Sequence, residues 1–430
     1  MKRHGNLWND LISMENLEVA FEKAKKHKSW QRQVKEVEKD KEAKLKQLQE
    51  MLTNKTYKVS EYRERTIYEP KERQIYILPF YPDRIVQHAL MNIISPIWDK
   101  MFVNDSYSCR ENKGQHKASM KAEIYTVRND YVLQCDISKF YPSINHDILF
   151  NIVKRKIKDK NVLWLIETII RSFPGGKNAP IGNYTSQWFG NLYLHELDII
   201  IKQKYHIKDY IRYCDDFLIF GNNKDILWDI GKELKEWCKI NRNLKLSKLR
   251  LYKTEEGVDF LGYRHMKNHY VLLRKSTAKR FKKHIKELRW QIDCGAVPLD
   301  NARSSVDSLL GWMKHACTYH LSLSLGLEKL RSEIMRGLPK SLNSKLDYIH
   351  VYNHMNEEYY KPIFKALLDS KDAWFFVKEL KDKNGIVDDT HKVVEDEENK
   401  TFSQYELREN PNAKIFRLGF TVEEVQKIIE

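Results

Sequence analysis

The 430-residue sequence lacks several features that would assign it to a common class of protein. No apolar run approaches the roughly 18 residues of a transmembrane helix, and the N-terminus has no apolar signal segment. The six cysteines form no C-x-x-C pair, which disfavours structural zinc, and isolated cysteines are typical of reduced thiols in the cytoplasm. There is no internal repeat and no low-complexity tract. We therefore expect a cytoplasmic protein with no membrane partner.

Charge is abundant but unevenly distributed. The chain has 75 Lys and Arg against 59 Asp and Glu, a net charge of +16. Residues 366–430 contain 15 acidic and 10 basic residues, a net charge of −5, so residues 1–365 carry +21. A large basic body indicates a polyanionic partner, most simply nucleic acid. Residues 23–46 hold ten basic residues against four acidic ones, which fits either a solvated helix face or an RNA contact.

Hydrophobic spacing predicts a mixture of helices and strands. The expected helices cover residues 15–52, 83–102, a segment that begins near Ser143 or Asn145, 182–205, 224–240 and 276–292, the last capped by Ser276. The expected strands cover residues 66–68, 74–78 and 131–136, a hairpin at 210–220, and 258–263. Residues 366–430 are expected to form a small, mixed, acidic unit.

Two aspartate positions are the strongest candidates for chemistry. Asp136 ends an apolar strand, and Asp215 and Asp216 lie at the tip of the hairpin at 210–220. Adjacent carboxylates at a buried tip repel each other, so a cation between them would stabilise them. Two Mg²⁺ ions suit such oxygen ligands and catalyse phosphoryl transfer.

Several motifs around these aspartates resemble the conserved boxes of reverse transcriptases, in the order of that family. Residues Tyr213–Asp216 read Y-C-D-D and resemble the Y-x-D-D box. The other motifs are D-I-S-K-F-Y at 136–141, I-G-N-Y-T-S-Q at 181–187 followed by Asn191, F-L-G-Y at 260–263, K-E-R at 71–73, D-R-I-V-Q-H at 83–88 and S-Y-S-C-R at 106–110. These motifs lie within residues 65–265, about half of the chain.

The resemblance implies an α+β fold, a right-hand polymerase with fingers, palm and thumb and an antiparallel palm sheet. The implied domains are a basic helical N-terminal extension (1–60), fingers (61–130), palm (131–265, with a fingers insertion around 145–180), a helical thumb (266–335) and a C-terminal extension of unknown role (336–430). No RNase H, maturase or endonuclease pattern is evident in the extension.

The resemblance also implies a role for individual residues. The implied metal ligands for two Mg²⁺ ions, with Mn²⁺ as an alternative, are the catalytic carboxylates of Asp136, Asp215 and Asp216 and the carbonyl of Ile137. The implied dNTP-binding residues are Lys71, Arg73, Tyr141, Ile181, Gly182 and Gln187, of which Tyr141 would exclude a 2′-hydroxyl. The implied nucleic-acid-binding residues are Arg110, Lys248, Lys253, Lys275, Lys279, Arg280 and Lys283. A protonated side chain among Lys248, Arg250 and Lys253 would donate to the leaving pyrophosphate, and the sequence does not choose between them.

Ile181 departs from the retroviral and intron enzymes, which have Gln at this position. The I-G-x-x-x-S-Q form resembles the enzymes of diversity-generating retroelements and related bacterial reverse transcriptases. An isoleucine side chain cannot hydrogen-bond the incoming nucleotide, and a lost polar contact is worth about 1–3 kcal/mol. We therefore expect reduced fidelity.

The expected activity is RNA-templated DNA synthesis from dNTPs on a structured non-coding RNA, giving a cDNA product. The extension after the thumb slightly favours antiphage defence over a low-fidelity diversity-generating retroelement. A catalytically decayed RNA-binding scaffold and protein-primed, template-independent synthesis are the rival interpretations. The template, the primer and any protein partner or self-association stay open.

Overall fold

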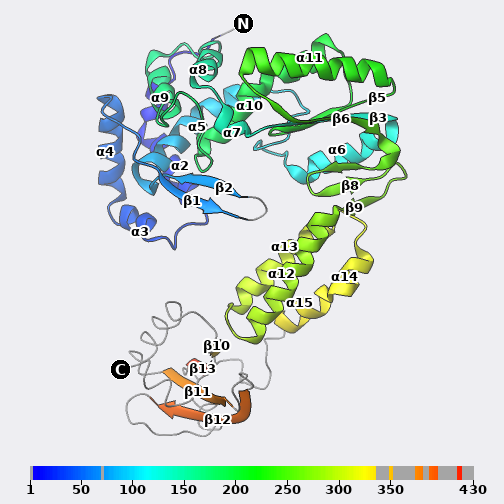
Figure 1. The fold of residues 1–430 in the computed structure, drawn as a ribbon. Coiled ribbons are helices and arrows are strands. Elements are labelled where there is room, and N and C mark those ends of the chain that lie inside the picture. The colour runs from blue at the N-terminus through cyan, green and yellow to red at the C-terminus, as the bar shows by residue number, and fades with distance from the viewer. Residues whose placement is uncertain are drawn as a thin grey trace. The chain divides into compact units, whose positions relative to one another are not determined.

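The computed structural model describes residues 3–68 and 72–335 in full and, beyond them, the backbone of four short strands. The chain divides into two compact units, Met1–Tyr270 and Val271–Glu430, close to the predicted boundary between palm and thumb (Figure 1). Within the described residues, no helix combines the length and the apolar character that a membrane span requires.

The first unit begins with four helices instead of one long one. These are α1 (Trp8–Ile12), α2 (Met14–Lys25), α3 (Arg32–Lys39) and α4 (Lys41–Thr53). The prediction of a single helix over residues 15–52 is therefore wrong. The helix is interrupted at His27, whose φ of 62° is left-handed, and again at Asp40, whose φ of −133° and ψ of 43° are not helical.

A two-stranded hairpin and a long helix follow. Strands β1 (Arg63–Ile67) and β2 (Arg73–Ile77) pair antiparallel, with Arg63 opposite Ile77 and Ile67 opposite Arg73. A π-helical turn, η1 (Phe80–Arg84), leads into α5 (Ile85–Asp99). Both extended segments and the helix agree with the sequence predictions.

The central sheet has four antiparallel strands in the order β4-β5-β3-β6. Its strands are β3 (Tyr131–Ile137), β4 (Tyr210–Tyr213), β5 (Asp216–Gly221) and β6 (Leu246–Lys253). The predicted strand at 131–136 and the predicted hairpin at 210–220 are confirmed, and so is the antiparallel palm sheet.

Side chains alternate between the two faces of this sheet because a strand has a period of two residues. Leu133, Cys135 and Phe217 face the main core, which contains residues of α10 (Tyr184–Ile199) and α11 (Lys224–Arg242). Val132 and Leu218 face a second core with residues of α6 (Gln115–Arg128) and β7 (Val258–Phe260). By the same alternation, Asp136 and Asp216 belong to the face of this second core. Strand β8 (Tyr263–His265) pairs with β7, and the 3₁₀ turn η3 (Thr254–Glu256) precedes that pair.

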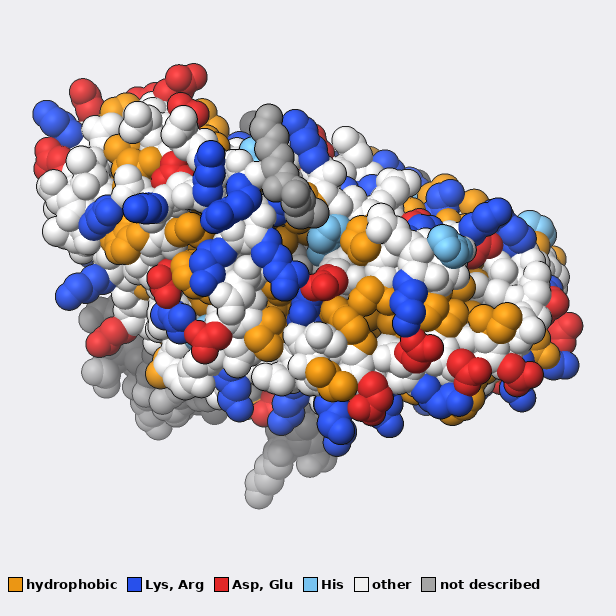
Figure 2. All heavy atoms as spheres, turned by 90° about the horizontal axis from the view of Figure 1, so that it is seen from above, with side chains coloured by type: hydrophobic (Ala, Val, Ile, Leu, Met, Phe, Trp, Pro, Cys, Tyr) orange, Lys and Arg blue, Asp and Glu red, His pale blue; other side chains and the backbone are white. Residues whose placement is uncertain are grey.

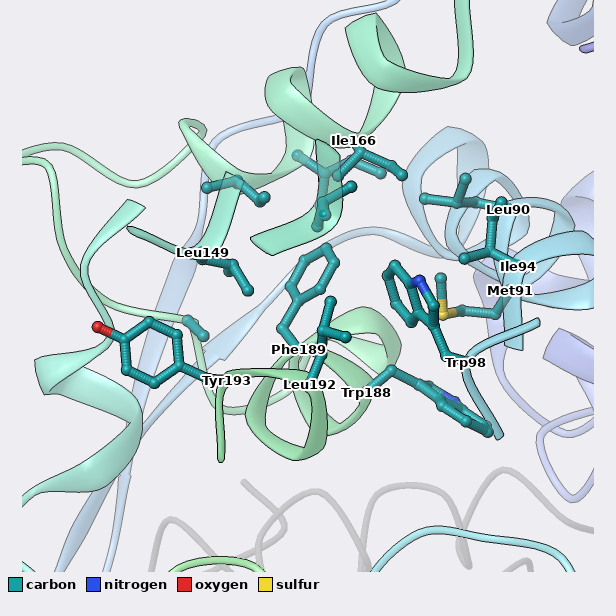
Figure 3. Close-up of a cluster of buried hydrophobic side chains, with 14 of the residues drawn as sticks. Leu90, Met91, Ile94, Trp98, Leu149, Ile166, Trp188, Phe189, Leu192 and Tyr193 are labelled. Atoms are coloured by element: carbon teal, nitrogen blue, oxygen red, sulfur yellow. The ribbon is translucent and has the colours of Figure 1, made fainter. Parts of the chain in front are cut away.

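The segment between β3 and β4 is mainly helical. It contains α7 (Phe140–Ser143), α8 (His146–Lys154), α9 (Lys160–Ile170), α10 and the π-helical turn η2 (Ile200–Lys204). Asn145, one of the two predicted caps, accepts a hydrogen bond from the amide of Ile148 at the start of α8. Figure 3 shows how α10 inserts Phe189 and Leu192 between side chains of α5, α8 and α9, so this helix is buried on several sides.

The described part of the second unit contains a short strand and four helices, and then a small sheet. The elements are β9 (Val271–Leu273), α12 (Lys275–Asp293), α13 (Leu299–Met313), α14 (Tyr319–Leu325) and α15 (Leu327–Met335). Phe281, Ile285, Leu288 and Ile292 of α12 are buried, as predicted. The predicted cap Ser276 is wrong, because Arg274 occupies the N-cap position and Ser276 lies inside the helix.

The described part of residues 336–430 is one four-stranded sheet in the order β10-β13-β11-β12. Its strands are β10 (Tyr348–Val351), β11 (Ala373–Leu380), β12 (Val387–Glu395) and β13 (Lys414–Leu418). The rest of the predicted acidic unit at 366–430 lies outside the described residues.

Candidate active site

The three predicted catalytic aspartates meet at one end of the central sheet. Asp136 of β3 and Asp216 of β5 are directly paired across the two antiparallel strands. Side chains opposite each other on neighbouring strands share a face and have Cβ atoms about 4.5–5.5 Å apart. Asp215 directly precedes Asp216 in the turn between β4 and β5. The sequence motifs 80 residues apart are thus brought together as predicted.

The turn that carries Asp215 is a two-residue connection, because Tyr213 pairs with Asp216. Its first residue, Cys214, has a φ of 59°, which is left-handed. Two-residue hairpins favour such positive φ values because their twist matches that of the strands. A residue with a Cβ in this region is strained, so neighbouring groups must stabilise the turn.

The electrostatic environment of Asp215 indicates crowded negative charge. Burial raises the pKa of its carboxyl above the ordinary value, and the charge of Asp136 raises it further. The Arg73 guanidinium acts in the opposite direction. The carboxylate cluster and the cation of the β1–β2 hairpin therefore interact electrostatically across the fold.

Ser247 is a neighbour of Asp136 that the sequence interpretation missed. The register between β3 and β6 shifts where Asp136 pairs with Lys248 and Ile137 pairs with Leu246, so Ser247 is the extra residue of a β-bulge. Bulges re-aim side chains next to functional sites. The Ser247 hydroxyl donates to the Asp136 carboxylate and lies 3.1 Å from the Asp136 carbonyl oxygen. No sequence motif marks this residue, because the bulge depends on the pairing of distant strands.

The donor set suits a divalent metal in its chemistry. Asp136, Asp215 and Asp216 offer carboxylate oxygens, and the carbonyl of Ile137 belongs to the same strand end; Mg²⁺ and Mn²⁺ prefer such hard ligands. Among the residues described here, no three acidic, histidine or cysteine side chains are already grouped as a metal cluster. Asp136 accepts the Ser247 hydroxyl through Oδ2, and its carboxylate has a second oxygen that a metal could bind.

Tyr141 lies beside this cluster. The Cys214 thiol donates to the Tyr141 hydroxyl at 3.2 Å, and burial raises the pKa of the Tyr141 hydroxyl above its ordinary range. Burial also raises the pKa of the Cys214 thiol to about 12. A Cβ at Gly190 would lie 3.3 Å from the ring of Tyr141 and 3.1 Å from that of Phe140. The glycine of α10 thus leaves room for both rings.

The β1–β2 hairpin is attached to the loop that carries the predicted dNTP-binding residues Ile181 and Gly182. The Tyr76 amide donates to the Ile181 carbonyl at 2.8 Å. Gly182 has a φ of 126°, and a Cβ there would lie 2.2 Å from the Tyr76 carbonyl oxygen. Only glycine permits this approach. Arg73 is exposed at the start of β2.

Two predicted dNTP-binding residues remain, Gln187 and Lys71. Gln187 is exposed in the first turn of α10, and Lys71 lies outside the described residues.

Arg110 has a different role from the one predicted. Its side chain is 7% exposed, and its Nε donates to the Asp99 carboxylate at 2.6 Å. The other guanidinium nitrogens donate to the carbonyls of Val103, Ser106 and Asp99. This guanidinium is used to fix the loop after α5, so the predicted contact with nucleic acid is corrected to a structural role.

The three cations considered as proton donors lie at different distances from the aspartates. Lys248 pairs with Asp136 across β3 and β6, and its Nζ lies 2.6 Å from Oε1 of Gln134. Arg250 lies two residues further along β6 and forms an ion pair with Glu256 at 3.2 Å. Lys253 is five residues from Lys248, which is about 17 Å along a strand, and its odd spacing turns it to the opposite face. Lys253 is therefore wrong as a proton donor, whereas Lys248 lies beside the site.

The other predicted nucleic-acid cations lie on α12 of the second unit. Lys275, Lys279 and Lys283 are exposed, and Arg280 is half-buried. They occupy a face different from the buried stripe of the same helix. Figure 2 shows a different face, seen from above Figure 1, where Lys and Arg side chains gather over one part and acidic and basic side chains are mixed over the rest.

These features define a class of protein. An antiparallel sheet with paired aspartates at the end of its two central strands, packed helices and an attached finger hairpin is the palm and fingers of a right-hand nucleic-acid polymerase. Residues 63–265 match the family model described as reverse transcriptase (RNA-dependent DNA polymerase) and are a domain of that family. The prediction of a reverse transcriptase is thereby confirmed, whereas the finer resemblance to diversity-generating and defence-associated enzymes stays a prediction.

Known relatives agree with this assignment. The chain is 23% identical to the protein YkfC of Escherichia coli strain K12 over 239 residues, which cover 44% of this chain and 61% of that protein. It is 26% identical over 174 residues to the group II intron-encoded protein LtrA of Lactococcus lactis subsp. cremoris, covering 38% of this chain and 29% of LtrA. It is 22% identical over 249 residues to the putative COX1/OXI3 intron 2 protein of Saccharomyces cerevisiae, covering 42% and 29%. The chain thus spans less than two thirds of each of these proteins.

Proposed function

We propose that this protein is an RNA-directed DNA polymerase that extends a primer with dNTPs on a structured non-coding RNA. The observation that supports it best is the pairing of Asp136 with Asp216, next to Asp215, within the reverse transcriptase domain. Such a cluster of carboxylates has little use in a protein that only binds RNA, since acidic side chains repel phosphates.

The aspartates and the Ile137 carbonyl would hold two Mg²⁺ ions, or Mn²⁺ in their place. When bound, such ions lower the pKa of the primer 3′-hydroxyl and neutralise charge on the triphosphate. Ser247 orients the Asp136 carboxylate through its hydrogen bond. Lys248, level with Asp136 on the neighbouring strand, is the side chain we assign to proton donation toward the leaving pyrophosphate.

The dNTP would lie between the aspartates and the β1–β2 hairpin. Arg73, whose charge lowers the pKa of Asp215, and Lys71 bind the triphosphate, and a guanidinium does so bidentately. Tyr141, fixed by Cys214, lies under the sugar and excludes a 2′-hydroxyl. The loop with Ile181 and Gly182 and the start of α10 with Gln187 complete this site.

The template–product duplex would be bound by the cations of α12, which are Lys275, Lys279, Arg280 and Lys283. Exposed lysines of the N-terminal helices would bind structured RNA, since phosphate contacts account for much of the affinity for nucleic acid. The expected compartment is the cytoplasm. All six cysteines are free thiols, which are typical of that compartment.

The test of the activity is primer extension on an RNA template with full-length protein. Asp215→Asn keeps the size of the side chain but removes its charge, and we expect it to lower cDNA synthesis at least a thousandfold. The matched control is Asp229→Asn on the exposed surface of α11, which should keep full activity. If Asp215→Asn retained the biological function of the protein, the scaffold interpretation would replace the enzyme. A DNA product attached to protein and made without RNA would establish protein-primed synthesis instead.

For the biological role we propose antiphage defence, supported by the extension beyond α15, with targeted diversification as the alternative supported by Ile181. Sequencing the nucleic acid that co-purifies with the protein separates the two. A single structured RNA with matching cDNA supports defence or a retroelement, whereas cDNA with errors concentrated at template adenines supports diversification.

A further inference from the structure

A fully buried ion pair lies behind the turn that carries the catalytic aspartates. Arg212 of β4 and Asp198 of α10 are both 0% exposed. The Arg212 Nε and Nη2 donate to the two oxygens of Asp198 at 2.7 and 2.6 Å, which is a bidentate arrangement. The Tyr210 hydroxyl donates to the same carboxylate at 2.6 Å.

The third nitrogen of Arg212 connects this pair to the turn. Its Nη1 donates to the Cys214 carbonyl at 3.0 Å and to Oδ1 of Asn191 at 3.2 Å. Cys214 is the residue with the left-handed φ of 59°, directly before Asp215. Strained backbone of this kind persists where neighbouring groups fix it. Arg212 fixes its carbonyl on one side, and Tyr141 accepts its thiol on the other.

Backbone hydrogen bonds of Arg212 connect the catalytic turn to the predicted fingers. Its amide donates to the Asp105 carbonyl at 2.9 Å, and the Tyr107 amide donates to the Arg212 carbonyl at 2.9 Å. Asn191 also donates to the Ser108 carbonyl at 2.7 Å. One residue thus connects α10, the segment at 105–108 and the catalytic turn.

A buried ion pair seldom stabilises a fold more than apolar side chains of the same volume, because desolvation offsets the attraction. What the ion pair does supply is a fixed orientation of the Arg212 guanidinium, since bidentate binding allows a single geometry. Arg212 and Asp216 lie on opposite faces of the hairpin, as the alternation along β4 and β5 requires. The ion pair therefore supports the turn from behind, without occupying the space in front of the carboxylates.

We propose that Arg212 and Asp198 are positioning residues for metal binding: they hold the turn at Cys214 so that Asp215 and Asp216 present their carboxylates together. This inference rests on the proposed function of that site. It predicts that loosening the pair weakens metal binding even where the protein stays folded.

The experiment compares Arg212→Lys with Arg242→Lys in the full-length protein. Arg242 is a matched control, because its side chain is 5% exposed and it also binds α10, through the Tyr193 carbonyl at 2.8 Å and Glu196 at 2.5 Å. Within the described residues, its guanidinium donates to Tyr193, Asn241 and Glu196 and to no group of the catalytic turn. Three quantities are measured for each variant: the melting temperature, Mn²⁺ affinity by electron paramagnetic resonance without dNTP, and the Mg²⁺ concentration for half-maximal cDNA synthesis.

We expect Arg212→Lys to weaken Mn²⁺ binding and to raise the Mg²⁺ requirement, each by about tenfold or more. Arg242→Lys should lower the melting temperature and leave both metal measurements unchanged. A folded Arg212→Lys protein with wild-type Mn²⁺ affinity would overturn the proposal, and so would equal metal effects in the two variants.

Where Arg212→Lys does not fold, Tyr210→Phe decides the question, because it removes one hydrogen bond to Asp198 and keeps the ion pair. A two- to fivefold loss of Mn²⁺ affinity supports the proposal, and unchanged affinity refutes it. If the wild-type protein bound Mn²⁺ but made no cDNA, the proposed function would fail while the Mn²⁺ comparison still tested the positioning role.

Discussion

Gly182→Ala should destabilise the protein through one identifiable contact. At this position the backbone has a φ of 126°, and the added Cβ would lie 2.2 Å from the Tyr76 carbonyl oxygen. That is more than about 1 Å inside the normal contact distance. The loop must therefore move away from β2, and the hydrogen bond from the Tyr76 amide to the Ile181 carbonyl must lengthen.

The magnitude follows from two contributions. Backbone strain at such a φ costs about 1–3 kcal/mol for a residue with a Cβ. Loss of the hydrogen bond between Tyr76 and Ile181 adds about 1 kcal/mol. We expect the free energy of unfolding to fall by roughly 2–4 kcal/mol, as measured by urea denaturation. Because Arg73 lies on the same strand as Tyr76, the KM for dNTP should also rise.

Gly175→Ala is the matched control. Gly175 lies in the preceding loop with a φ of 89°, but a Cβ there would meet no atom within 4 Å. This variant has the strain without the clash, so it should lose only about 1–2 kcal/mol and keep the wild-type KM. Equal destabilisation by the two substitutions would show that the approach of Tyr76 does not constrain residue 182.

Three further predictions concern the site and its surroundings. Ser247→Ala removes a donor to the Asp136 carboxylate, a bond of about 1 kcal/mol, so the Mg²⁺ concentration for half-maximal synthesis should rise about fivefold; an unchanged Mg²⁺ curve would contradict the role of the bulge. Ile181→Gln restores a polar side chain beside the incoming nucleotide and should lower the misincorporation rate in sequenced cDNA; an identical error spectrum would argue against the fidelity hypothesis. Burial lowers the pKa of His265 to about 4, so the folded protein keeps this ring neutral while the unfolded chain protonates it below about pH 6.5. Stability should therefore decrease by up to roughly 3 kcal/mol as the pH falls from 6.5 to 4, and His265→Gln should flatten this dependence whereas the exposed His284→Gln should not.

Local patterns predicted the palm well. An apolar strand that ends in Asp136 and a hairpin with acids at its tip are both encoded within short segments, and the structure confirms both. The same holds for α11, whose apolar spacing is regular over the whole helix. These elements can be predicted without knowledge of distant residues, because alternation and turn length are properties of the local sequence.

The predictions that failed depended on tertiary contacts. The resemblance to reverse transcriptases made Arg110 a candidate for binding nucleic acid, but the carbonyls that accept its guanidinium belong to a loop whose path the sequence does not show. The position of Ser247 beside Asp136 follows only from the register between β3 and β6. The turn at His27 interrupts a helix pattern that the spacing of hydrophobic residues appeared to continue. The opposite orientation of Lys253 and Lys248, by contrast, follows from their odd spacing in the sequence once residues 246–253 are known to form a strand.

The turn at Cys214 connects the proposed metal ligands with the proposed sugar-selecting ring of Tyr141. Its carbonyl is held by Arg212, its thiol contacts Tyr141, and the next residue is Asp215. A change that rotates this peptide therefore moves a metal ligand and the contact of the proposed sugar-selecting ring at once. Variants of the ion pair behind the turn should accordingly lose metal affinity and discrimination between dNTP and rNTP together. Variants at Ile181, whose side chain offers no ligand to a metal, should affect use of the dNTP without changing metal binding.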